Sequence, residues 1–271
     1  MRWLIAALPL GLLAVPAAAT LQPPQPALAT RACFLLLDTV SGHLLRDPAD
    51  LCTTRVPPAS TFKIAHAIAA LESGIITGPD DVIPYDGTPR EYDTWRRDHS
   101  LRSAMRYSVV WYFQELARRL GMDEEDFYLR RLRYGNEDPS SGLTTFWLGG
   151  SLRISPVEQL TFLRRLYYDE LPVRETTMRT VREILVQPPG AIVNAAGEQP
   201  FDAPWPPETT LSAKTGSVSF DLNRGVRWIV GQVQRDRRAW IFVSCVTGTA
   251  DLDAKAAIDL AARALRANGV L

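Results

Sequence analysis

The spacing of apolar residues changes twice along this chain, and that change constrains the fold more than any other feature of the sequence. Cys33–Asp38 is an apolar run typical of a buried strand, and residues 43–46 are expected to return beside it. From about residue 77 to residue 189 the apolar spacing is three and four, which is typical of helices. The last third returns to strand-like runs. This order predicts an α+β fold, with a central antiparallel sheet built from N- and C-terminal strands and flanked by helices.

Apolar spacing, together with helix start and stop signals, places the expected elements. Ser155, Pro156 and Glu158 resemble a helix start, and Ser73-Gly74 is an ordinary helix stop. Helices are expected at about 60–72, 101–120, 155–168 and 252–268, and strands at 211–214, 226–233 and 240–246, with a polar turn at 234–238 between the last two strands.

Residues 1–19 resemble a cleavable secretory signal. The positive Met1-Arg2 precedes the apolar run Leu4–Val15, and Pro16–Ala19 supplies the small residues that favour cleavage after Ala19. The run is shorter than the ~20 apolar residues of a membrane span, although a retained anchor helix is the alternative. We therefore expect a periplasmic or secreted protein that is free of the membrane once the signal is removed.

The remaining residues, 20–271, are numerous enough for one large domain with a substantial core. Within this single domain, 20–76 and 190–271 are expected to form the α/β part. Residues 77–189 are expected to form a mainly helical middle subdomain.

The charge balance gives no sign of a nucleic-acid partner. The chain has 30 Lys and Arg residues against 30 Asp and Glu residues. Arginine clusters at 130–133 and 235–238 fit a solvated helix face and a hairpin turn. The three histidines are scattered, and none stands at metal-ligand spacing from a cysteine or another histidine, so no metal site is expected. The sequence does not indicate an oligomeric state.

The three cysteines have different settings. Cys33 and Cys52 bracket a strand–turn–strand candidate, and in an oxidising compartment either a disulfide or two free thiols is compatible with the sequence. Cys245 lies in an apolar run, where a buried thiol is expected.

Ser60 and Lys63 form the first candidate catalytic pair. If Ser60 opens a helix, its hydroxyl and the Lys63 amine lie on one helix face. A serine hydroxyl is a weak nucleophile until a base takes its proton, and Lys63 can be that base only when its amine is neutral. The residues around Lys63 are apolar almost all round the helix, which predicts burial and a lowered lysine pKa. A serine N-cap with a lysine that reaches the surface is the alternative for this motif alone.

Lys214, Thr215 and Gly216 form the second motif, at the end of a strand-like run. A lysine on a strand beside a glycine allows a substrate carboxylate or backbone to approach closely. The two motifs, in this order and about 150 residues apart, are the arrangement of penicillin-recognising serine enzymes.

Five ordered motifs are similar to those of the class D, oxacillinase-type β-lactamases, and the resemblance covers nearly all of residues 20–271. The motifs are Pro58–Ile64, Ser108–Val110, Tyr134–Asn136, Phe146–Leu148 and Lys214–Gly216. The class A pattern fits less well, because the chain has neither its S-D-N motif nor its glutamate motif. The resemblance implies the α+β fold of serine β-lactamases and penicillin-binding transpeptidases, and a small-molecule β-lactam substrate.

The resemblance also implies catalytic roles for the matching residues. Ser60 would be acylated, and Lys63 would be carboxylated by carbon dioxide to N6-carboxylysine, which would serve as base in acylation and deacylation without any other cofactor. Trp147 would donate its indole N–H to that group, Ser108 would relay protons, and Lys214 would help hold the substrate carboxylate.

Substrate contacts are implied for a further set of residues. The backbone N–H groups of Ser60 and Ser217 would form an oxyanion hole. The other implied contacts are Thr215, Gly216, Val110, Leu148 and Phe62.

Some positions depart from the family pattern or carry a structural interpretation. Residue 217 is a serine where many relatives have an aromatic residue. Many relatives also have an arginine that binds the substrate carboxylate, and Lys255 is its nearest equivalent here. Ser212 is therefore a further candidate for the carboxylate contact. Tyr134-Gly135-Asn136 is interpreted as a structural turn beneath the site, and His66 as a packed histidine and not a base.

Two alternatives share these motifs: a D,D-peptidase that deacylates β-lactams very slowly, and a penicillin sensor that is acylated once. Trp147 and Val110 favour the lactamase, because they suit a carboxylated lysine. An α/β-hydrolase is excluded, because the chain has no G-x-S-x-G nucleophile motif.

Overall fold

A computed structural model describes residues 29–48, 51–221 and 223–271. The expected signal and its cleavage site therefore lie outside the described residues. Among the described residues, no helix has the length and apolar character needed to cross a membrane, and no group of three metal-ligating side chains is found.

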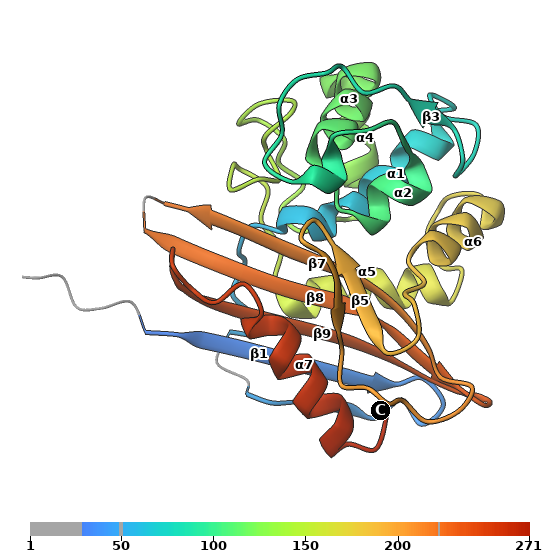
Figure 1. Ribbon diagram of the computed structural model, residues 1–271, viewed down its shortest axis with the longest axis vertical. Coiled ribbons are helices and arrows are strands. Elements are labelled where there is room, and N and C mark those ends of the chain that lie inside the picture. The colour runs from blue at the N-terminus through green and yellow to red at the C-terminus, as the bar shows by residue number, and fades with distance from the viewer. Residues whose placement is uncertain (1–28, 49–50, 222) are drawn as a thin grey trace, which may run out of the picture.

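One five-stranded antiparallel sheet contains strands from both ends of the chain, as predicted. Its order is β2-β1-β9-β8-β7, in which the N-terminal strand β1 pairs with the last strand β9. In Figure 1 the blue β1 lies beside the orange-red strands of the last third. The strands are β1 (Arg31–Asp38), β2 (Leu44–Arg46), β7 (Thr210–Phe220), β8 (Arg224–Arg235) and β9 (Arg238–Thr249).

Both faces of this sheet are covered by apolar cores, which explains why its strands read as nearly continuous apolar runs. Successive residues of a strand point to opposite faces. Phe34 and Phe242 belong to the core shared with helix α7 (Ala256–Ala267), which lies across one face in Figure 1. The next residues, Leu35 and Val243, belong to the core on the opposite face, which is shared with the helical half.

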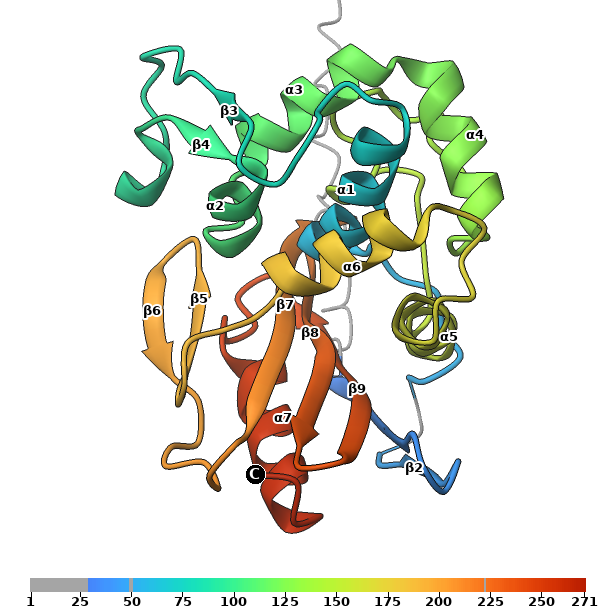
Figure 2. The same ribbon diagram turned by 90° about the vertical axis from the view of Figure 1, so that its right-hand side faces the viewer.

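The helical half gathers around α1 (Lys63–Glu72), in which every residue from Lys63 to Leu71 is buried. A 3-10 turn at Ala59–Phe62 precedes α1, so the helix expected from Ser60 begins with a tighter turn. Figure 2 shows α1 between α6, α3 and α4, above the ends of β7 and β8. The other helices are α2 (Leu101–Arg106), α3 (Val110–Leu120), α4 (Met122–Leu132), α5 (Pro156–Tyr167) and α6 (Glu175–Ile184).

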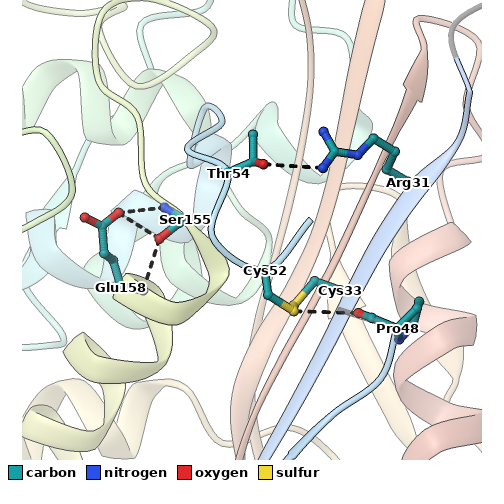
Figure 3. The surroundings of a disulfide bond; sticks show 7 residues. All are labelled: Arg31, Cys33, Pro48, Cys52, Thr54, Ser155 and Glu158. Atoms are coloured by element: carbon teal, nitrogen blue, oxygen red, sulfur yellow. Dashed lines mark hydrogen bonds between the residues drawn. A yellow bond between two sulfur atoms is a disulfide. The ribbon is translucent and has the colours of Figure 1, made fainter. Parts of the chain in front are cut away.

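The helix start predicted at Ser155 is confirmed. The Glu158 backbone N–H donates to Ser155 Oγ, and the Ser155 backbone N–H donates to Glu158 Oε2, so each residue caps the other (Figure 3). Pro156 occupies the first helical position. A backbone N–H at this position has no acceptor within the helix, so proline loses no hydrogen bond there.

One expectation about secondary structure is wrong, and two small strand pairs were not predicted. Residues 101–120 form two helices and not one, because Ser108 adopts a left-handed conformation (φ 55°) between them. The hairpin of β5 (Ala191–Asn194) and β6 (Gly197–Pro200) was not predicted, since its short strands show no clear apolar alternation. A second small pair, β3 (Val82–Ile83) and β4 (His99–Ser100), interrupts the mainly helical middle.

A disulfide joins Cys33 to Cys52 and settles the question left open by the sequence. It connects β1 to the segment that leads into the Ser60 turn, as Figure 3 shows. Cys245 is free and buried, as expected.

The disulfide is expected to stabilise the fold by limiting the freedom of the unfolded chain. Its cysteines are 19 residues apart, and a loop of this size is worth about 3 kcal/mol. The double variant Cys33→Ala/Cys52→Ala should therefore unfold at lower denaturant concentration, measured by far-UV circular dichroism. Dithiothreitol should shift the wild-type midpoint in the same direction and leave the double variant unchanged. An unchanged midpoint in the double variant would contradict this account.

Candidate active site

An open cleft lies where the helical half meets the edge of the sheet. Its lining includes the Ser60 turn, the start of α3, the loop after Phe146, strand β7 and the tip of the β5–β6 hairpin. The predicted site residues that line it are Ser60, Ser108, Val110, Leu148, Thr215, Gly216 and Ser217. Most residues of the predicted site are therefore brought together.

Ser60 is held by a turn that contacts strand β7 and is tied to strand β8. Ala59 before it has φ 49°, a left-handed conformation that is strained for a residue with a side chain. The Trp228 indole donates to the carbonyl of Pro57 at 2.9 Å, which ties the turn to β8. Gly216 faces the same turn: a Cβ at Gly216 would lie 3.0 Å from the Pro58 carbonyl oxygen. The glycine of the second motif thus lets β7 approach the backbone of the Ser60 turn closely.

Lys63 lies directly against Ser60. Its Nζ is 2.7 Å from Ser60 Oγ and donates to the Ser108 carbonyl at 3.1 Å. The side chain has no exposed surface. Burial holds the pKa of Lys63 well below its ordinary value, and the nearby charge of Lys214 lowers it further. A neutral amine in hydrogen-bond range of a serine hydroxyl is the geometry of a nucleophile with its base.

Ser108 connects two lysines. Its Oγ lies 3.3 Å from Lys63 Nζ and accepts a hydrogen bond of 2.9 Å from Lys214 Nζ. Lys214 also donates to the Thr215 carbonyl at 2.9 Å, and burial lowers the pKa of its amine from 10.5 to about 7. The left-handed conformation of Ser108 ends α2 at this point and lets α3 begin at Val110. A chain of proton-carrying groups therefore runs from Ser60 through Lys63 and Ser108 to Lys214.

Trp147 is fully buried beside this chain in a cluster of rings. Its ring centroid lies 5.7 Å from that of Phe62 and 5.0 Å from that of Phe146. The indole N–H has no hydrogen-bond partner among the described residues. A buried donor without an acceptor costs about 1–3 kcal/mol, so its retention calls for a functional explanation.

Tyr134, Gly135 and Asn136 form the structural turn that the sequence predicted. The Asn136 side chain donates to the Ser151 carbonyl and accepts from the Arg153 N–H, so it fastens two loops together. Gly135 has φ 60°, and a Cβ there would lie 2.1 Å from the Arg153 carbonyl oxygen. This turn fixes the loop that carries Trp147.

Three residues considered as substrate contacts do not line the cleft. Phe62 is 2% exposed, and its ring packs beneath the site against Trp147 and Tyr134, so it does not reach the cleft in this structure. Ser212 lies on β7, two residues before Lys214, and its side chain is beside Tyr167 and not in the cleft lining. Lys255 is half-exposed and its Nζ is 3.5 Å from Asp259, although the neighbouring Ala254 and Ile258 do line the cleft.

The sequence did not reveal the outer wall of the cleft. Glu91, Tyr92 and Trp95 line it from the loop before β4, opposite the tip of the β5–β6 hairpin. The Thr94 hydroxyl donates to the Ala195 carbonyl at 2.7 Å and joins these two loops. Neither segment carries a periodic or motif signal, because their contact depends on residues about a hundred positions apart.

Comparisons with known proteins agree with the predicted resemblance. Residues 38–267 match the protein family described as the penicillin binding protein transpeptidase domain. The probable beta-lactamase YbxI of Bacillus subtilis is 36% identical over 80% of this chain and 74% of its own length. Beta-lactamase OXA-10 of Pseudomonas aeruginosa is 36% identical over 79% of this chain and 75% of its own length.

Two further comparisons bear on structure and on alternative roles. The solved structure of the class D beta-lactamase BAT-2 is 33% identical, with a TM-score of 0.77 over 89% of this chain and 93% of that one. The regulatory protein BlaR1 of Bacillus licheniformis is 34% identical over 80% of this chain, which spans only 33% of BlaR1.

The lowered pKa of Lys214 predicts a pH dependence of stability. Between about pH 7 and pH 10 the unfolded chain holds a proton on Lys214 that the folded protein does not hold. The free energy of unfolding should therefore rise with pH across this interval, by about 3 kcal/mol from Lys214 between pH 7 and pH 9.5. Urea titrations in buffers free of carbon dioxide would measure it.

Two substitutions make this test specific. Lys214→Met should reduce the rise to the contribution of Lys63, which has the same sign. The exposed control Lys255→Met should keep the wild-type slope. A wild-type slope in Lys214→Met would show that this amine is charged in the folded protein.

Proposed function

The chain belongs to the class D serine β-lactamase family, and we propose that it hydrolyses β-lactam antibiotics through an acyl-enzyme formed on Ser60. The 2.7 Å contact between Ser60 Oγ and the unexposed Nζ of Lys63 carries this proposal. Because burial lowers the pKa of Lys63, its neutral form is available near neutral pH to accept the hydroxyl proton.

The residues of the cleft can carry both halves of the reaction. Ser60 Oγ loses its proton to the base at Lys63 and attacks the lactam carbonyl carbon, while the backbone N–H groups of Ser60 and Ser217 stabilise the oxyanion. The lactam C–N bond breaks, and Ser108 Oγ passes a proton to the departing nitrogen. Water then attacks the Ser60 ester, gives its proton to the same base, and releases the ring-opened acid as Ser60 regains its hydroxyl.

The surroundings of Lys63 fit the carboxyl group that the family resemblance implies on its nitrogen. Carbon dioxide reacts with a neutral amine, and the buried Trp147 N–H is a donor that lacks an acceptor among the described residues. When present, the carboxyl group supplies the general base for acylation and deacylation. Val110 and Leu148 form apolar walls of the cleft and limit the water that reaches this group.

Lys214 and Thr215 are the proposed contacts of the substrate carboxylate. Thr215 lines the cleft, and the Lys214 amine lies just beneath it on the same strand. An arriving carboxylate favours the charged form of Lys214, whose pKa of about 7 lets it take up a proton readily.

The protein is further proposed to act outside the cytoplasm, in the periplasm or as a secreted enzyme. The signal-like pattern of residues 1–19 and the Cys33–Cys52 disulfide support this location, since disulfides persist in oxidising compartments.

A sensor or D,D-peptidase is the second candidate, and the similarity to BlaR1 favours it specifically. Such a protein would form the same acyl-Ser60 and keep it, so the two candidates differ in deacylation alone. The buried Trp147 donor and the apolar walls favour the hydrolase, because they suit a group that serves as the base for deacylation.

Turnover of a chromogenic cephalosporin separates these candidates. The wild-type protein should complete many turnovers per molecule, and added bicarbonate should raise the rate. Ser60→Ala and Lys63→Ala should each lower kcat roughly a thousandfold or more, because nucleophile and base act as a unit. Ser140→Ala, in an exposed loop, is the matched serine control and should keep wild-type turnover.

A single stoichiometric burst would contradict the hydrolase proposal. Mass spectrometry would then find the opened lactam retained on Ser60, which is the result expected of a sensor or peptidase.

A further inference from the structure

A buried pair of ionisable side chains lies behind the catalytic lysine and takes no part in the steps above. His66 is on α1, three residues after Lys63, and has no exposed surface. Its Nε2 is 2.8 Å from Glu125 Oε1, and Glu125 on α4 is 1% exposed. The sequence suggested only a packed histidine at this position.

The short distance requires at least one of the two groups to be protonated. A carboxylate oxygen and an unprotonated ring nitrogen both carry lone pairs and would repel each other at 2.8 Å. The pair therefore shares at least one proton, whether this resides on the ring or on the carboxyl group. The two side chains are close, but neither atom has a well-aligned hydrogen bond, and Nδ1 of His66 has no partner among the described residues.

Burying this pair costs more free energy than burying apolar residues of the same size. Removing a carboxylate from water is expensive, and a buried pair often adds nothing to stability over a hydrophobic replacement. The His66 ring packs against the rings of Phe62 and Phe113, which carry no charge that could compensate the pair. A role in stability alone does not account for the pair.

His66 instead contacts two parts of the catalytic centre. Its ring meets the Trp147 indole edge to face, with centroids 5.5 Å apart and planes at 68°. It also packs on Phe113, whose ring centre lies 5.5 Å from Lys63 Nζ. The His66 ring therefore lies between two others. One is Phe113, which packs near the Lys63 amine, and the other is Trp147, whose indole N–H has no partner among the described residues.

We propose that His66, held in place by Glu125, is a positioning residue that sets the orientation of the Trp147 indole N–H toward the carboxyl group of Lys63. This inference rests on the proposed function, because the group that Trp147 would bind exists only if Lys63 is carboxylated. The apolar neighbours of Trp147 contact its faces without a directional bond. The anchored imidazole fixes the ring against rotation and so reduces the cost of aligning its N–H.

Substituting the whole pair tests the inference without leaving a buried charge. His66→Phe/Glu125→Met keeps apolar volume and should fold with a melting temperature at or above the wild-type value. Its bicarbonate requirement for half-maximal turnover should rise about tenfold, which corresponds to about 1.4 kcal/mol of lost binding. Glu125→Gln keeps a polar side chain of the same shape beside His66 and should stay within about twofold of wild type.

The matched control is Glu72→Gln, at the other end of α1. Glu72 pairs with Arg174 at 3.0 Å and touches no group of the site, so its loss should lower the melting temperature and leave the bicarbonate requirement unchanged. If the double variant does not fold, His66→Gln provides the same test, because it can still contact Glu125 but loses the ring edge against Trp147.

Carbon-13 NMR with labelled bicarbonate separates failure of this inference from failure of the proposed function. The wild-type protein should show a carbamate signal that Lys63→Ala lacks, and the double variant should need more bicarbonate to reach it. Absence of the signal in wild type would overturn the carboxylated lysine itself. A wild-type signal with an unchanged bicarbonate requirement in both His66 variants would overturn only the positioning role.

Discussion

The removal of the Lys63 amine from water is the constraint on which the rest of the structure depends. An exposed lysine would remain charged at neutral pH and could not take a proton from Ser60. Burial of nine of the ten residues of α1 requires partners on all sides, and the helix obtains them from the helical half and from the sheet below it. The two halves of the fold therefore meet at this buried amine.

The site is assembled by segments that are individually rigid for local reasons. The Ser60 turn is fastened to the sheet by Trp228 and fits against a glycine on β7. The Ser108 segment is the junction of two short helices, and the Trp147 loop is clamped through Asn136. Each of these contacts ends on a backbone group. The positions of the site side chains are therefore set by the main chain of the segments that carry them.

Sequence reasoning recovered the parts of this design that are local. Apolar runs identified the strands, and the spacing of Ser60 and Lys63 predicted the close approach of their side chains, because a helix or tight turn places both on one face. It failed where geometry depends on distant contacts. Phe62 sits in a motif yet faces inward, and the left-handed Ser108 interrupts a pattern that looks continuous. The Thr94–Ala195 contact and the His66–Glu125 pair join segments whose proximity no periodicity encodes.

The pairing of β1 with β9 has a consequence for how the chain reaches this structure. Thr39 bonds the backbone of Ala239, two hundred residues later, so the central strand order cannot form until the last fifth of the chain is available. Contacts of such sequence separation slow folding, because a large loop must close before they stabilise anything. A chain emerging from synthesis or passing through a narrow channel would therefore stay open until nearly its whole length had cleared the exit. Late closure of this kind suits a polypeptide that must be threaded before it folds.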